Sequence, residues 1–194
     1  MMQVSSVASA SLGVGAIHQM RFDAASGLLA PNEPAQRVVR PGASPLHLVL
    51  HPNGHVLYAI NEHDAAIDVF TIEPAHGTLA LVQTTVSLPP GFTGKPWAAD
   101  LHLTPYGSER RSHTLAAFAV DASSGRLSPL GHTSVPAEPR GFNITADGRW
   151  LIVAGQASGN VGVFSINTLT GALGAVGEHA VGRGPNWIET VRLA

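Results

Sequence analysis

The sequence contains no cysteine, few charged residues and no long hydrophobic run. The absence of cysteine excludes disulfide bonds and thiol catalysis, although it does not fix the cellular compartment. Lys, Arg, Asp and Glu make up only 12% of the 194 residues and the formal net charge is -2, so the basic surface that binds nucleic acid is missing. No run of apolar residues is long enough to span a membrane, so no membrane association is expected.

The beginning of the sequence, MMQVSSVASASLGVGA, is small and neutral. It lacks the basic start and the strong apolar stretch of a secretory signal peptide, and we therefore predict a cytoplasmic protein. No low-complexity linker divides the chain. The length suits one domain with a sizeable core, so residues 1–194 are predicted to form a single domain.

A unit of roughly fifty residues repeats along the chain. Two copies share the same order of turn, apolar strand, polar link, second strand and closing G-x-L. They read HPNGHVLYAINEHDAAIDVFTIEPAHGTL at residues 51–79 and TADGRWLIVAGQASGNVGVFSINTLTGAL at residues 145–173. A shorter copy covers residues 104–127, and a partial copy opens at Gly13. Self-similarity at this period is typical of solenoids, propellers and repeat arrays.

Each copy is introduced by a strand that begins with proline. The four prolines are Pro45, Pro96, Pro139 and Pro185, separated by 51, 43 and 46 residues. Within the second unit, Gly, Pro, Asn and Asp separate four strand-like runs, at residues 46–50, 55–61, 66–73 and 78–86. No window sustains a helical apolar period with caps. The sequence therefore predicts an all-β fold, a β-propeller built from four-stranded antiparallel blades.

The propeller is predicted to be partial. The chain begins inside a unit, with strands expected at residues 13–23 and 28–39, and it finishes on a lone first strand at residues 187–193. If the two ends combined into one blade, the chain would hold about four blade equivalents, within the usual range of propellers. The alternative is an open arc with exposed sheet faces, which predicts self-association.

The third copy is shorter than the others. Five residues are missing between Pro105 and Tyr106, where the other copies carry NGHVL and DGRWL. The missing piece corresponds to a turn and the first half of a second strand. We predict an incomplete strand there, produced either by a deletion or by a naturally short blade.

Several segments together resemble the lactonase family of seven-bladed propellers. They are P-x-H-L-x-x-HPNG, Y-x-x-NE, F-TG-x-x-x-AADLHLTP, F-x-VD-x-x-x-GRL and EPR-x-F-x-x-x-x-DGR-x-L-x-VA-x-Q. The family includes propeller-type 6-phosphogluconolactonases and fungal carboxymuconate cyclases. The resemblance extends from about Leu12 onward and corresponds to the C-terminal part of such a protein. It implies hydrolysis of a sugar-acid lactone, as in the oxidative pentose phosphate pathway.

The resemblance implies three catalytic residues. His47 lies in the family's P-R-H segment, in which Leu46 replaces the arginine; Glu62 ends a second strand; His102 lies in the A-D-[IL]-H segment with Asp100. Lactone opening needs a base that activates water and a donor that stabilises the oxyanion. The alternative interpretation of His47 and His102 is a buried structural histidine, and that of Glu62 is a solvated carboxylate in a turn. Because Asp100 and His102 alone fall short of a metal site, no metal or cofactor is expected.

Three further residues are implied to bind substrate. Arg110 matches the S-N-R segment with Glu109 in place of asparagine, Arg140 matches a P-R segment, and Gln156 matches an N-Q segment with Gly155 in place of asparagine. Guanidinium groups bind phosphate or carboxylate in a bidentate manner, so the expected ligand is a small anionic lactone. Plain surface charge is the alternative for the arginines.

Three hypotheses for function follow. The first is a lactone hydrolase that resembles 6-phosphogluconolactonase. The second is a non-catalytic propeller remnant or binding scaffold. The third is a carboxymuconate-cyclase-like lyase, which would use the same rim for a ligand with several carboxylates.

Overall fold

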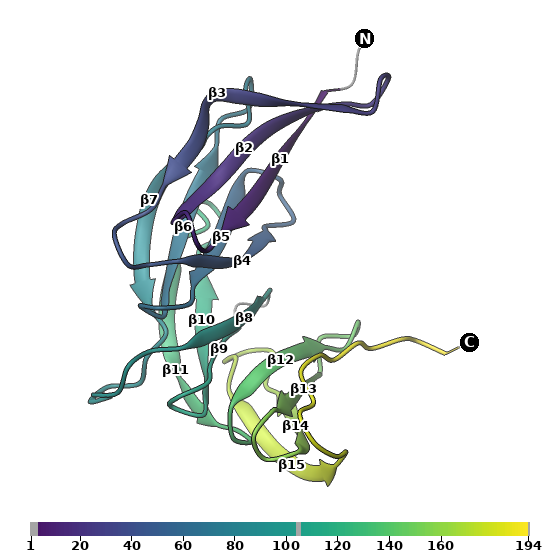
Figure 1. Ribbon diagram of the computed structural model, residues 1–194. Helices are drawn as coiled ribbons and strands as arrows, with labels where there is room; N and C mark the ends of the chain where they lie inside the picture. Colours follow the sequence, from purple (N-terminus) through teal and green to yellow (C-terminus); the bar gives the residue numbers. More distant parts are fainter. Residues whose placement is uncertain (1–3, 104–105, 194) are drawn as a thin grey trace.

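The computed structural model describes residues 4–103 and 106–193. Within these residues, fifteen strands form four separate antiparallel sheets and no helix is present. The described residues therefore contain no helix with the length and apolar character needed to cross a membrane. The sheets follow one another along an open arc, with the first sheet at one end and the fourth at the other (Figure 1). The all-β, partial-propeller prediction is confirmed.

The second sheet matches the predicted blade closely. Its strands, in order of pairing, are β4 (Pro45–Leu50), β5 (Val56–Asn61), β6 (Ala66–Ile72) and β7 (Leu79–Val86). The turn between β4 and β5 is closed by a hydrogen bond from the His51 amide to the Val56 carbonyl. Gly54 sits in this turn with a φ of 73°, a conformation that side chains disfavour. The HPNG segment therefore fixes the start of β5.

The third sheet contains the shortened strand. Its strands are β8 (Ala98–His102), β9 (Tyr106–Glu109), β10 (Thr114–Val120) and β11 (Leu127–Ser134). The predicted deletion site touches residues 104–105, which lie outside the described residues. β9 has 4 residues, whereas β5 and β13 each have 6, so the short second strand is confirmed. All of β9 is nevertheless buried.

The fourth and first sheets are at the two ends of the arc. The fourth contains β12 (Pro139–Ile144), β13 (Trp150–Gly155), β14 (Asn160–Ile166) and β15 (Leu173–Ala180). The first contains β1 (Val4–Ser11), β2 (Ala16–Asp23) and β3 (Leu28–Val38). The strands expected at residues 13–23 and 28–39 correspond to β2 and β3, but β1 was not predicted. Its sequence, VSSVASAS, is rich in serine and alanine, which carry a weak strand signal.

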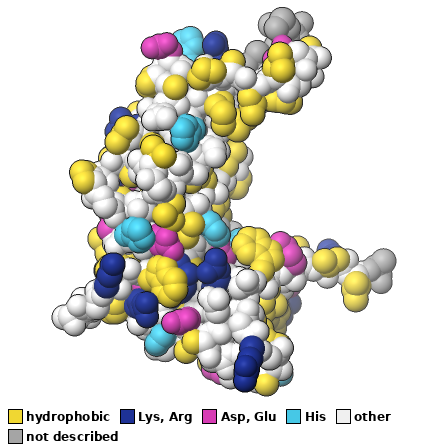
Figure 2. All heavy atoms as spheres, in the orientation of Figure 1, with side chains coloured by type: hydrophobic (Ala, Val, Ile, Leu, Met, Phe, Trp, Pro, Cys, Tyr) yellow, Lys and Arg dark blue, Asp and Glu magenta, His cyan; other side chains and the backbone are white. Residues whose placement is uncertain are grey.

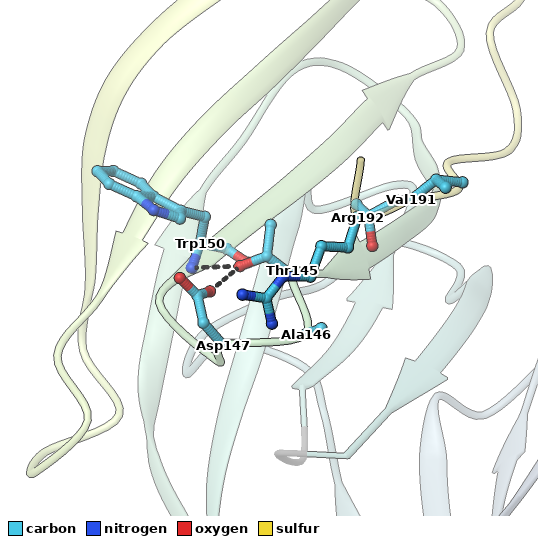
Figure 3. Close-up of a pocket in the computed structure, with 7 residues that line it drawn as sticks. Thr145, Ala146, Asp147, Trp150, Val191 and Arg192 are labelled. Atoms are coloured by element: carbon cyan, nitrogen blue, oxygen red, sulfur yellow. Dashed lines mark hydrogen bonds between the residues drawn. The ribbon is translucent and has the colours of Figure 1, made fainter. Parts of the chain in front are cut away.

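The prediction of a lone C-terminal strand at residues 187–193 is wrong. This segment is extended but forms no strand within the described residues. It runs beside β12, where the Asn143 side chain donates a hydrogen bond to the Ile188 carbonyl at 3.2 Å. Figure 1 places it far from β1, so it does not complete the N-terminal sheet. Arg192 extends from it toward the turn at Thr145 and Asp147, and the two segments enclose a small pocket (Figure 3).

Three apolar cores lie between successive sheets. The core between the first and second sheets includes Ile17 and Phe70, and the next includes Tyr58 and Phe118. The third, between the third and fourth sheets, includes Leu115. Because side chains alternate along a strand, β10 contributes Phe118 to one core and Leu115 to another. This packing brings β4, β8 and β12, the first strands of their sheets, next to each other.

Candidate functional site

A pocket of about 230 Å³ opens where β4, β8 and β12 meet. It is lined by Leu46, His47, Glu62, Ala99, Arg110, Arg140, Asn186 and Trp187. Four of the six predicted site residues are therefore brought together. They come from three different sheets, and the C-terminal segment supplies the remaining wall. No single sheet contains all four residues. The apolar cores between the sheets therefore keep these residues together.

The buried carboxylate of Asp100 anchors both predicted histidines. His47 Nδ1 lies 2.8 Å from Asp100 Oδ1, and His102 Nε2 lies 3.1 Å from Asp100 Oδ2. The backbone amides of Leu101 and Phe142 also donate to this carboxylate. Burial by itself raises the pKa of Asp100, but the hydrogen bonds from His102 and His47 outweigh it and hold the pKa well below its usual range. Asp100 is therefore an anion that orients two imidazole rings.

Glu62 and Arg110 form a second anchored pair. Arg110 Nη2 donates to Glu62 Oε1 at 2.6 Å, and the Trp97 indole N–H donates to the same oxygen at 2.7 Å. The Arg110 side chain is only 2% exposed and also donates to the Ala98 carbonyl. Burial lowers the pKa of Arg110, and the contact with Glu62 opposes this shift. The guanidinium is already paired, so it is poorly available to a ligand.

Arg140 is the least constrained cation of the pocket. It lies on β12, is exposed, and forms no ion pair of 4 Å or less among the residues that the structure describes.

Two predicted site residues, His102 and Gln156, do not line the pocket. His102 is joined to the pocket only through Asp100 and packs edge-on against Phe142, with ring centroids 4.8 Å apart. Gln156 lies in the turn after β13 and does not line the pocket; its backbone amide donates to the Glu138 carbonyl.

The comparisons identify the family of this chain. A family model described as "Lactonase, 7-bladed beta-propeller" matches residues 3–190. The chain belongs to this lactonase family. The 6-phosphogluconolactonase of Pectobacterium carotovorum is 38% identical to it over 174 residues, which cover 87% of this chain and 52% of the relative. The 6-phosphogluconolactonase of Yersinia pestis is 39% identical over 173 residues, covering 86% of this chain and 52% of the relative.

A solved structure of a gluconolactonase also matches this chain. The periplasmic gluconolactonase of Pseudomonas aeruginosa superimposes with a TM-score of 0.86 at 30% identity, covering 93% of this chain and 52% of that protein. This chain therefore spans about half the length of the relatives it matches. Its four sheets correspond to part of a seven-bladed ring.

Sequence reasoning missed three features of the candidate site. Asp100 was placed in the A-D-[IL]-H segment and in an incomplete metal pair but was given no role, although it joins His47 to His102. Trp97 was not among the predicted site residues, and Trp187 was predicted only as part of a strand. The alternating A-D-L-H segment carries the only signal for Asp100, since its contact with His47 spans 53 positions. In the described part of the chain, no three His, Asp or Glu side chains gather in a metal-binding arrangement.

Proposed function

We propose that this chain hydrolyses the ester bond of a sugar-acid lactone and that 6-phosphogluconolactone is its substrate. The observation that carries the proposal is the pairing of His47 with Asp100 in a pocket that also contains Arg140. The names of the relatives, 6-phosphogluconolactonase and gluconolactonase, support the reaction class. A role in the pentose phosphate pathway and a cytoplasmic location stay predictions from the sequence.

In this proposal His47 is the general base. Its Nδ1–H donates to Asp100, which leaves the lone pair of Nε2 free to accept a proton from water. The hydroxide oxygen then bonds to the lactone carbonyl carbon, and the carbonyl oxygen becomes an oxyanion beside the Arg140 guanidinium. Collapse of this intermediate breaks the ring C–O bond, and the leaving alkoxide takes the proton back from His47. Asp100 stabilises the imidazolium between the two proton transfers.

The contacts of Glu62 support a role different from the catalytic one that the resemblance implies. Its Oε1 atom accepts hydrogen bonds from both Arg110 and Trp97, so proton transfer at this oxygen would disrupt both contacts. We propose that Glu62 is a positioning residue that holds Arg110 against the pocket wall. The pair would then shape the pocket, while His47 carries out the proton transfers.

The test is acid release from 6-phosphogluconolactone, followed with a pH indicator and corrected for spontaneous hydrolysis. We expect His47→Asn to lower kcat by roughly 100-fold or more, in the range typical of general-base catalysis. His179→Asn is the matched control, because His179 is exposed on β15 at the outer edge of the fourth sheet. Full activity of His47→Asn would refute the role of His47. If the folded wild-type chain gives no hydrolysis above background, the non-catalytic hypothesis is correct.

A further inference from the structure

A second, larger pocket lies beside the candidate site. It has a volume of about 570 Å³ and is lined by His63, Phe92, Gly94, Lys95, Pro96, Trp97 and Arg111. No acidic residue is among these. In Figure 2, basic side chains gather around a hydrophobic side chain in the region that β8 and β9 occupy in Figure 1. The family resemblance assigned no role to any residue of this pocket.

Trp97 lines the second pocket and contacts two residues that line the first, Arg110 and Glu62. The Arg110 guanidinium carbon lies 3.7 Å from the centroid of the Trp97 ring, and that of Arg111 lies 4.7 Å from it. The indole N–H is bonded to Glu62, which lines the first pocket. His63 also connects the two, since it lines the second pocket and its Nε2 lies 3.6 Å from Glu62 Oε2. Glu62 of the first pocket therefore contacts two residues that line the second.

The cations of the second pocket are available to a ligand, unlike Arg110. The Arg111 side chain is 55% exposed, and its contact with Glu138 is long, at 4.0 Å. Lys95 is exposed and forms no ion pair among the residues that the structure describes. Arg110, by contrast, is buried against Glu62. Two exposed cations, of which only Arg111 has an acidic contact and that a long one, line a pocket with no acid in its wall and favour a ligand with a compact double negative charge.

We propose that this pocket is a phosphate subsite and that Arg111 and Lys95 bind the phosphate group of the lactone substrate. Arg111 can bind two phosphate oxygens at once, and Lys95 supplies a point charge beside it. This inference rests on the proposed function, because it places the lactone carbonyl at His47. It agrees with the oxyanion role that the proposed mechanism gives Arg140, because other residues then hold the substrate's anionic group. The second pocket would select phosphorylated lactones over unphosphorylated ones.

The test compares two ligands that differ only in the phosphate. Binding of 6-phosphogluconate and of gluconate is measured by titration calorimetry with the full chain. In the double variant Lys95→Gln/Arg111→Gln, we expect 6-phosphogluconate to bind about tenfold more weakly or worse, with gluconate affinity unchanged. The control is Arg126→Gln/Arg149→Gln, which removes the same charge from two exposed arginines that line neither pocket. It should retain wild-type affinity for both ligands.

Three outcomes would overturn the subsite: no phosphate-dependent difference in the wild type, wild-type affinity in the double variant, or an equal loss in the control. The failure of the proposed function is recognised separately. If the chain does not hydrolyse the lactone but still prefers 6-phosphogluconate in a manner that requires Lys95 and Arg111, the subsite stands without the activity. If it hydrolyses the lactone and the double variant keeps its preference for the phosphorylated substrate, only the subsite is wrong.

Discussion

Replacing Asp100 with asparagine removes one negative charge from a side chain that is only 2% exposed. Its Oδ1 atom accepts from His47 and from the Leu101 amide, and its Oδ2 atom accepts from His102 and from the Phe142 amide. An asparagine of the same size turns an NH₂ group toward two of these donors. We expect the free energy of unfolding to fall by about 2–4 kcal/mol, because a hydrogen bond to a charged group contributes about 1.5–3 kcal/mol and bonds in one cluster are not additive.

The loss of stability in Asp100→Asn should depend on pH. The pKa of Asp100 is lower in the folded chain than in the unfolded chain. The carboxylate therefore contributes its full stability above the unfolded-state pKa of about 4, and that contribution is lost as pH falls through the folded-state pKa. The difference in unfolding free energy between wild type and Asp100→Asn should accordingly be greatest at neutral pH and smaller near pH 3.

Urea denaturation at the two pH values measures both effects. Glu178→Gln serves as the control, since Glu178 is exposed on β15, and its stability should be close to wild type. A loss below about 0.5 kcal/mol at neutral pH would show that the carboxylate does not organise the site. A difference that stays constant down to pH 3 would refute the assignment of a low pKa to Asp100.

Two further predictions concern the sheets. Amide hydrogens of β9 should exchange faster than those of residues 161–165 in β14, because β9 pairs with β10 at only four positions, Thr114 to Ala117, whereas residues 161–165 lie inside longer ladders with a partner strand on both sides. Equal protection measured by native-state hydrogen exchange would contradict this. The chain should also self-associate, because its end sheets carry exposed apolar side chains such as Leu28 at 68% and Val176 at 61%. Light scattering over a range of concentrations tests this, and a monodisperse monomer at all of them would argue against it.

The sequence predicted most strands because turn residues mark their limits. HPNG precedes β5 and ADG precedes β13, and both strands begin within a residue or two of the glycine. The weakly apolar β1 gives no such signal. The pocket was largely predictable, because the resemblance singled out both His47 and Arg140, which lie on the first strands of the second and fourth sheets. The bond between His47 and Asp100 was not, because it depends on how two sheets pack against each other, which no local pattern encodes.

Asp100 links the architecture of this chain to its candidate chemistry. It lies on β8, and its carboxylate is bonded to His47 on β4 and to the Phe142 amide on β12. One buried anion thus joins the first strands of three consecutive sheets, at the point where the pocket opens. Because protein interiors tolerate little change in volume, any shift between these sheets would move His47 relative to Arg140. At Asp100, stability and activity should therefore change together. Arg140 is exposed and unpaired among the described residues, so its replacement should affect the chemistry alone.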